Sequence, residues 1–367
     1  MHHSLNRWRP AGLRLCLPPV WGRMLRCVAL LALAGCTSVP PTRINSDRID
    51  YGQVVAESWK RQTLLNVVRL RYADAPVFVD IASIINSYTV GGNASAQGTL
   101  PSGVNPSFLE FGGTANWSNT PTVTYQPLLG DRFTRALLQP IPPVSVFQLL
   151  QGGWPVTLVF QTVVGSVNGL RNASAGAAAD PGFRELSEAL TRIQHAGNIG
   201  IRVEPRKDGS GVVAVIRRAQ PGTPLGDDSR RVRELLGLAD DVNEFAVVHG
   251  LVPSNPKEVA LLSRSIMEIM LQLGFGIDVP AAHLDSGWVL PGTPQPGEAT
   301  GRPLVHVRSG TDEPTHAYAA VRYKGHWFWI EDTDIESKRI FTFLMILFSL
   351  AETGQAVAAP VVTVPSR

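Results

Sequence analysis

Two long stretches of alternating sequence constrain the fold of this chain more than any other feature. From Ser83 to Thr99, polar residues occupy most odd positions, and apolar or small residues occupy most even ones. From Leu109 to Tyr125 the alternation returns, with Phe111 and Trp117 among its apolar positions. A period of two over so many residues is typical of β-strands, and the intervening PSGVNP predicts a turn. We therefore expect a long antiparallel hairpin, with strands longer than the usual ~5–6 residues.

Such a hairpin has two explanations, and the sequence leaves both open. It can pack by one face on its own domain. Alternatively, each copy of an oligomer can contribute the 83–126 hairpin to an outer-membrane pore or secretion subunit, because a membrane-spanning strand needs only ~9–11 alternating residues. Gly91, Gly92, Ala94 and Ala96 would give such a strand a thin lipid-facing surface.

The N-terminal part has the pattern of a signal peptide. Arg23 and Arg26 flank Met24, and an uninterrupted apolar run follows from Cys27 to Ala34. This run is about half the ~20 residues that a membrane-spanning helix needs, which favours a signal sequence. Residues 1–23 are too long for the start of a signal peptide and contain Pro18 and Pro19, so we expect the true start at Met24.

The run ends in Leu33-Ala34-Gly35-Cys36, which resembles the lipobox of bacterial lipoproteins. The resemblance covers residues 24–38 and implies that residues 1–35 are removed and that Cys36 is acylated. Two or more acyl chains would hold the protein stably on a membrane. Thr37 stands where the family's inner-membrane retention signal has Asp, which implies the outer membrane, with the body facing the periplasm. An ordinary secretory signal with a coincidental Cys36 is the alternative.

Cysteine and charge agree with an exported protein. Cys16, Cys27 and Cys36 are the three cysteines, so the mature chain would keep only the lipidated one and form no disulfide. Residues 1–35 contain five arginines and no acid, so their removal changes the formal net charge from +3 to −2. A nucleic-acid partner therefore has no electrostatic basis. We expect contact with the membrane through the lipid, protein partners in the envelope, and a possible homo-oligomer.

The body is expected to be α+β, with helices packed on antiparallel sheets. Residues 36–45 form a tether, residues 46–172 a helix-plus-hairpin domain and residues 173–367 an α+β domain. A closing helix, apolar on all sides from Ile340 to Ala351, is expected at the centre of its domain. Further expected helices are 131–139, 144–151, 156–167, 180–196, 229–236 and 255–273, and further strands are 199–204, 212–217, 244–249, 304–307, 317–323, 327–331 and 361–364.

No residue stands out as catalytic, cofactor-binding or metal-ligating. Two groups near the C-terminus are speculative. His316, His326, Glu331, Asp332 and Asp334 could form a metal or acid–base site, although a turn histidine and helix-capping acids are the simpler interpretation. Trp327 and Trp329, with His326 beside them, form a speculative ligand surface on which peptidoglycan sugars could stack; core packing against the closing helix is the simpler interpretation.

Two phrases of the body, ESWKRQTLLNVVRLRYADAPVF and WFWIEDTD, are similar to hypothetical bacterial lipoproteins, and this resemblance implies no specific activity. Three hypotheses follow. The first is a lipid-anchored, non-enzymatic interaction or assembly component of the cell envelope. The second is an oligomeric outer-membrane pore or secretion subunit that uses the hairpin. The third is a peptidoglycan-binding protein or cell-wall enzyme.

Overall fold

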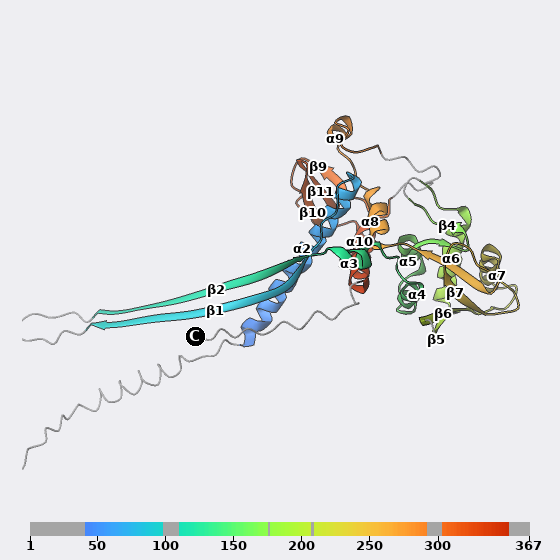
Figure 1. Ribbon diagram of the computed structural model, residues 1–367, viewed down its shortest axis with the longest axis horizontal. Helices are drawn as coiled ribbons and strands as arrows, with labels where there is room; N and C mark the ends of the chain where they lie inside the picture. The colour runs from blue at the N-terminus through green and yellow to red at the C-terminus, as the bar shows by residue number, and fades with distance from the viewer. Residues whose placement is uncertain (1–40, 98–109, 175–176, 207–208, 292–302, 352–367) are drawn as a thin grey trace, which may run out of the picture. The chain divides into compact units, whose positions relative to one another are not determined.

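The computed structural model describes residues 41–97, 110–174, 177–206, 209–291 and 303–351 (Figure 1). The chain divides into two compact units, Met1–Ala56 and Glu57–Arg367. Helix α2 (Pro41–Arg71) begins in the first unit and ends in the second, and the following description concerns the second unit. The lipobox, the PSGVNP turn and the expected strand at 361–364 lie outside the described residues.

The expected hairpin is confirmed. Strand β1 (Val79–Gln97) pairs antiparallel with β2 (Glu110–Pro127) in a sheet of two strands, seen as two long arrows in Figure 1. The helix expected before it, from Ser46 to Tyr72, is also confirmed, although α2 begins earlier, at Pro41, within the residues expected to form the tether. Its Leu64, Val67 and Val68 are fully buried, as the helical spacing of these apolar residues predicts.

A mixed six-stranded sheet forms a second part of the fold, in the order β4-β3-β8-β7-β6-β5. Strands β7 and β8 are parallel, whereas every other neighbouring pair is antiparallel, so the largest sheet is mixed although mostly antiparallel as expected. The strands are β3 (Val164–Val167), β4 (Leu170–Arg171), β5 (Ile199–Arg206), β6 (Gly209–Ile216), β7 (Glu244–His249) and β8 (Glu258–Ser263).

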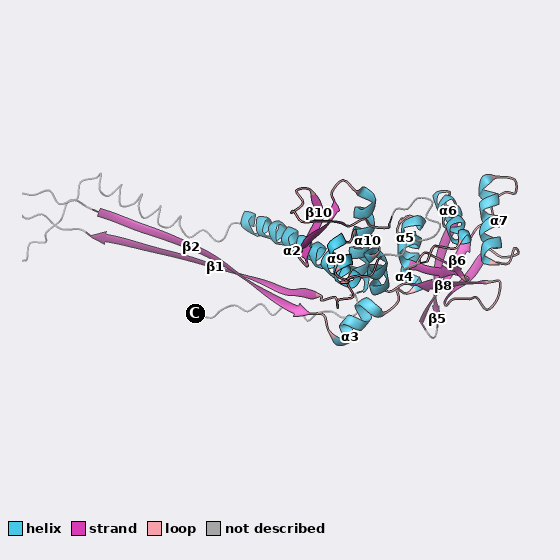
Figure 2. Ribbon diagram, turned by 90° about the horizontal axis from the view of Figure 1, so that it is seen from above, coloured by secondary structure: helices cyan, strands magenta, loops and turns pink. Residues whose placement is uncertain are grey.

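Helices α4 to α7 lie near this sheet (Figure 2). Helix α4 (Pro143–Gln151) packs against β5 to β8, while α6 (Pro181–His195) packs against α7 (Pro224–Leu236) and against α5 (Val156–Val163). The domain boundary expected at 172–173 falls between β4 and α6. Strands β3 and β4, which precede it, and strands β5 to β8, which follow it, belong to the same six-stranded sheet.

The third part is a three-stranded antiparallel sheet, in the order β10-β11-β9. Its core side meets α2 and α10, where Phe328 contacts Tyr72 and Tyr318 contacts Phe341. The expectation of a buried closing helix is confirmed, since Phe341, Phe343, Leu344, Leu347 and Phe348 of α10 are at most 3% exposed. The elements here are α3 (Gly130–Phe133), the π-helical turn η1 (Thr134–Leu138), α8 (Ile266–Gly274), α9 (Ala281–Asp285), β9 (Arg308–Gly310), β10 (Ala317–Tyr323), β11 (His326–Glu331) and α10 (Ile335–Ala351).

The helix expected at 255–273 is wrong in its first half. Residues 258–263 form the central strand β8, and the helix begins only at Ile266. Asn255 does not cap a helix; its side chain accepts from the Lys257 amide in a turn, at 2.9 Å. The true capping box is Ser265 with Glu268, in which each side chain accepts from the other residue's backbone amide.

The helix expected at 156–167 is right only as far as Val163, where the chain changes directly into strand β3. The abrupt end is possible because side chains satisfy the carbonyls that the helix leaves unpaired. Asn172 Nδ2 donates to the carbonyl of Gln161 at 3.2 Å and to that of Val164, the first residue of β3, at 2.8 Å. It also reaches the carbonyl of Phe160 at 3.0 Å, which accepts from the Val164 amide as well. The buried Arg264 donates to the carbonyl of Gln161 at 3.0 Å, and burial lowers the pKa of its guanidinium to about 10.

The strand expected at 304–307 is wrong. Strand β9 begins only at Arg308, and Val307 makes an isolated bridge with Ile277. The cap of α10 is Asp334, which accepts from the Ser337 amide at 3.1 Å.

Candidate functional surfaces

The register of the hairpin places residues of similar polarity opposite each other on the two strands. It pairs Val90 with Trp117 and Ala96 with Phe111, so apolar positions of one strand oppose apolar or small positions of the other. The polar positions are opposed in the same way, as in the pair Thr89 and Ser118. A slip by one residue would mix the two sets, so the amphipathic sequence itself specifies this register. Among the described residues, neither β1 nor β2 pairs with any other strand.

The base of the hairpin is fixed to α2 by two side chains one helical turn apart. Asn66 donates to the carbonyl of Val77 at 2.8 Å and accepts from its amide at 2.9 Å. Gln62 makes the same pair of bonds with Val79, at 3.1 and 3.3 Å. These amides take the place of a neighbouring strand, so the start of β1 is held firmly. Sequence reasoning missed both residues, although a fully buried Asn66 in a helix is an unusual placement.

Large apolar side chains are exposed where the hairpin begins and ends. Tyr125 is 63% exposed, Leu129 70% and Val77 51%. Arg132, three residues after Leu129, pairs at 2.9 Å with Asp80, three residues after Val77. A group of exposed apolar residues rimmed by charge is typical of a surface that meets another protein or a lipid.

The expected ligand surface is divided between two faces of the C-terminal sheet. Phe328 and Ile330 of β11 are fully buried, while Trp327 and Trp329 alternate with them and are partly exposed on the other face. The interpretation that both tryptophans pack against the closing helix is therefore wrong. His326 shares the alternation of Phe328, so it lies on the core side and not beside the tryptophans.

Trp329 is held in one orientation. Its Nε1 donates to Oε1 of Glu331 at 3.0 Å, and Glu331 also pairs with Arg308 at 3.2 Å. The far edge of the indole lies over Gly310 of the neighbouring strand, where a β-carbon would come within 3.3 Å of the ring. A fixed, partly exposed indole is what stacking on a sugar requires, so the placement agrees with the glycan hypothesis for Trp329 and Trp327.

His326 belongs to a buried cluster at the end of α2. Its ring meets the ring of His283 edge-on, with centroids 4.5 Å apart, and its Nδ1 is buried without a hydrogen-bond partner. Nδ1 of His283 lies 2.6 Å from the hydroxyl of Tyr72. Burial lowers the pKa of His283, and the neighbouring His326 adds to this effect. Burial also raises the pKa of Tyr72 to about 12, so both groups are neutral near pH 7.

The turn between β10 and β11 covers this cluster. Lys324 and Gly325 both have positive φ, at 43° and 86°, as a two-residue hairpin turn requires. The Lys324 ammonium lies 3.7 Å from Asp74 and 5.3 Å from the centre of the Trp288 ring. The cation is thus held by a carboxylate and an aromatic ring of the protein itself, and the cluster joins α2, α9 and the turn.

Of the remaining residues of the speculative acidic and histidine group, His316 and Asp332 are neighbours, since the Asp332 amide donates to the His316 carbonyl at 3.4 Å. The carboxylates have other partners. Glu331 pairs with Arg308, Asp332 with Lys338 at 2.6 Å, and Asp334 caps α10. The Lys338 hydrogen bond holds the pKa of Asp332 below its usual value. Within the described ranges, no three His, Cys, Asp or Glu side chains are placed so that they could hold a metal ion.

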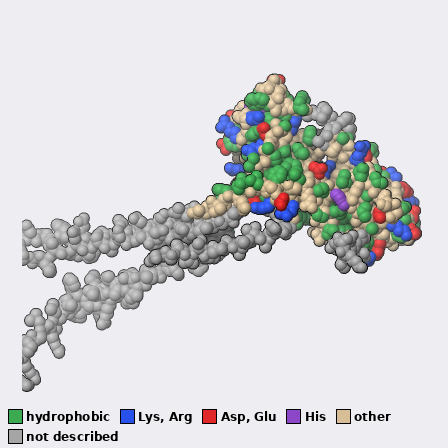
Figure 3. All heavy atoms as spheres, in the orientation of Figure 1, with side chains coloured by type: hydrophobic (Ala, Val, Ile, Leu, Met, Phe, Trp, Pro, Cys, Tyr) green, Lys and Arg blue, Asp and Glu red, His purple; other side chains and the backbone are tan. Residues whose placement is uncertain are grey.

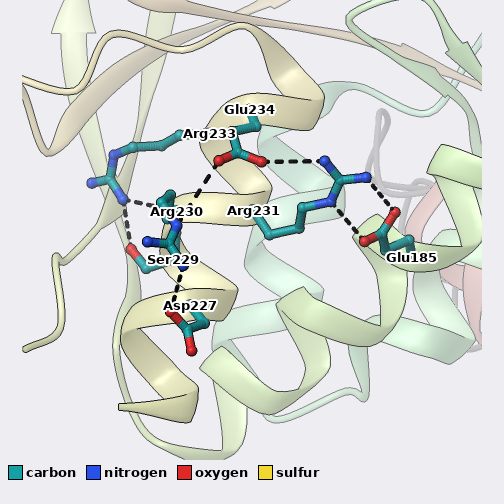
Figure 4. Close-up of polar contacts among 7 residues, drawn as sticks. All are labelled: Glu185, Asp227, Ser229, Arg230, Arg231, Arg233 and Glu234. Atoms are coloured by element: carbon teal, nitrogen blue, oxygen red, sulfur yellow. Dashed lines mark hydrogen bonds and ion pairs between the residues drawn. The ribbon is translucent and has the colours of Figure 1, made fainter. Parts of the chain in front are cut away.

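A network of ion pairs joins α6 and α7 (Figure 4). Arg231 binds both carboxylate oxygens of Glu185, at 2.6 and 2.8 Å, and also reaches Glu234 at 3.2 Å. These bonds lower the pKa of Glu185 and raise that of Arg231. All three side chains are well exposed, so the network is a solvated helix face and contributes little stability. On the face shown in Figure 3, basic and acidic side chains are interspersed in the same way.

Comparison with protein-family models, curated proteins and solved structures finds no match for this chain. In the part of the chain that the structure describes, no helix combines the length and apolar character needed to cross a bilayer.

Proposed function

We propose that this protein is a lipid-anchored component of the bacterial cell envelope that acts in interaction or assembly and not as an enzyme. The observation that carries the proposal is the β1–β2 hairpin, whose long strands pair only with each other among the described residues. An isolated two-stranded sheet is marginally stable in water, so a hairpin of this length favours a partner that completes it. The firm attachment of its base through Gln62 and Asn66 suits an element that transmits such a contact.

The anchor rests on the sequence around Cys36, with its basic start, short apolar run and Leu-Ala-Gly-Cys ending. The absence of Asp after Cys36 supports the outer membrane, with the body in the periplasm. Attachment by acyl chains would bring many copies onto one surface. Restricting them to a surface raises their effective concentration, which favours assembly through weak contacts.

Radiolabelled palmitate tests the anchor. We expect label in the wild-type protein and in Cys27→Ala, whose cysteine lies in the apolar run. We expect none in Cys36→Ala, because the acylated thiol is gone. Intact mass should show loss of residues 1–35 and a gain of acyl chains in the labelled proteins. Undiminished label in Cys36→Ala would contradict the proposal.

A second candidate function is an oligomeric outer-membrane pore or secretion subunit that inserts the hairpin. The specific observation in its favour is that residues 81–125 contain a single charged residue, Glu110, although they alternate as strands over most of their length. Charge-free polar positions alternating with apolar ones suit a strand between lipid and water. Multimers that resist SDS, together with conductance in planar bilayers, would support this function; a monomer in detergent without conductance would exclude it.

A further inference from the structure

We propose that the hairpin pairs with the hairpins of further copies of this chain, β1 of one copy against β2 of the next, in a closed ring. This inference rests on the assembly function proposed above and names its partner as a second copy. It is argued from the backbone pairing of β1 and β2 and from their sequences.

The backbone of the hairpin has two unpaired edges. In an antiparallel pair, about half of the N–H and C=O groups of each strand point to the partner, and the other half point outward. In β1 and β2 the outward groups form two edges, and among the described residues no other strand pairs with either one. Backbone groups strongly favour pairing, so long edges of this kind are ready templates for another strand.

Neither strand of the hairpin has much protection against pairing with another chain. Natural edge strands are protected by charged residues, by proline, by bulges or by covering elements. From Ser83 to Gln97, β1 contains neither a charge nor a proline, and its one irregularity lies at Ile81–Ser83, near the base. Beyond the base, β2 has one charge, Glu110 at its first residue, and one proline, Pro121, which cannot donate a hydrogen bond. The pairing between copies therefore falls on Glu110–Thr120 of β2, a length that meets the ~9–11 residues of a spanning strand.

The symmetry of the assembly decides whether any edge stays unpaired. A two-fold dimer would pair β1 with β1, or β2 with β2, and would leave the other edge of each copy open. A head-to-tail contact of β1 with β2 uses both edges of every copy, and it ends without open edges when the rotation closes a ring. The contact is antiparallel, as within one hairpin. Because each hairpin already separates its polar and apolar positions, the same alternation can continue from copy to copy.

Exposed apolar residues lie at the base of the hairpin. Tyr125 and Leu129 follow the paired part of β2, and Val77 precedes β1. A neighbour that pairs along β1 would bring its own Tyr125 and Leu129 toward the Val77 end of the first copy. The apolar residues would then be covered by the same contact that pairs the strands.

Cysteine cross-linking tests the arrangement, because the mature lipoprotein has no thiol other than the acylated Cys36. Ser87→Cys on β1 is made in one tagged copy of the full-length protein. Thr114→Cys, Asn116→Cys and Ser118→Cys on β2 are made singly in a copy with a different tag. Pairs are co-expressed, extracted in mild detergent and oxidised. The parent protein without added cysteines is the blank, and Ser254→Cys, on the exposed 250–257 connection, is the matched control.

We expect a disulfide-linked heterodimer for at least one β1–β2 combination, with no linked dimer when Ser87→Cys or the control is present alone. We also expect the lipidated protein in detergent to be a multimer of uniform size. Linked dimers from Ser87→Cys alone would overturn the proposal in favour of a two-fold dimer. A monomer in detergent, or a multimer without any β1–β2 link, would also overturn it. Palmitate labelling of the same samples separates these outcomes from a failure of the anchor.

Discussion

The hydroxyl of Tyr72 lies 2.6 Å from Nδ1 of His283, and 211 residues separate the two along the chain. Both residues are nearly fully buried, at 4% and 2% exposure. His283 also makes a hydrogen bond with the backbone of Lys324, so both sides of its ring are engaged. The hydrogen bond between Tyr72 and His283 thus joins the end of α2 to α9, next to His326. The bond between His283 and Lys324 joins α9 to the β10–β11 turn.

Replacing Tyr72 with Phe is expected to lower the free energy of unfolding by about 1–3 kcal/mol, because it leaves a buried ring nitrogen of His283 without a partner. The aromatic contacts with Tyr323 and Phe328 would remain. Urea unfolding of the two proteins measures the difference. The control is Tyr125→Phe, which changes an exposed tyrosine and should leave stability unchanged. Equal stability of Tyr72→Phe and wild type would show that the bond contributes nothing.

Stability is expected to fall in mild acid because of His283. Its pKa is lower in the folded protein than in the unfolded chain, so the unfolded chain binds the proton more readily. The stabilisation is therefore present above the unfolded pKa of about 6.5 and is lost as the pH falls through the folded pKa. Chemical denaturation at pH 7.5 and 5.5 should show a smaller loss for His283→Gln than for wild type. Identical losses would assign the acid sensitivity to other groups.

The sequence predicts the hairpin well and the buried cluster not at all. Alternation from Ser83 onward is long enough that only strands fit it, and the register follows from matching like residues. The Tyr72–His283 bond depends on how α9 and the β10–β11 turn are brought to α2, and no local pattern carries that information. The separation of His326 from Trp327 and Trp329, by contrast, follows from the alternation of β11, in which His326 shares the core side with Phe328.

The error at 255–273 has a local cause. Val259, Leu262 and Ile266 happen to follow helical spacing, but the first two belong to the strand β8. A short, buried central strand cannot be distinguished from a helix by periodicity alone. In the structure Leu262 is 37% exposed, which a helical core position would not be. The Ser265–Glu268 capping box is the signal that marks the true helix start.

A tight backbone approach after α8 provides a third prediction. At Gly276 a β-carbon would overlap the carbonyl oxygen of Val305, whereas at Gly274 it would meet its nearest atoms at 3.7 Å, an ordinary contact. Gly276→Ala should therefore destabilise the protein by roughly 2 kcal/mol or more. Gly274→Ala, inside α8, should be neutral or slightly stabilising. Thermal unfolding of both variants checks the contrast, and equal melting temperatures would contradict it.

The junction of α5 and β3 provides the last prediction. At this junction Asn172 Nδ2 donates to the carbonyls of Gln161 and Val164, and it is a second donor to the carbonyl of Phe160, which already accepts from the Val164 amide. Asn172→Ala removes these donors without changing the backbone, so it should lower the free energy of unfolding by about 1–3 kcal/mol. Arg264 would still bind the carbonyl of Gln161, so the protein should remain folded. The control is Gln161→Ala, an exposed change in the same helix with an expected effect below about 0.5 kcal/mol. Amide hydrogen exchange should localise the loss, with faster exchange in α5 and β3 than in α7. Uniform exchange across these elements would mean that Asn172 does not act at the junction.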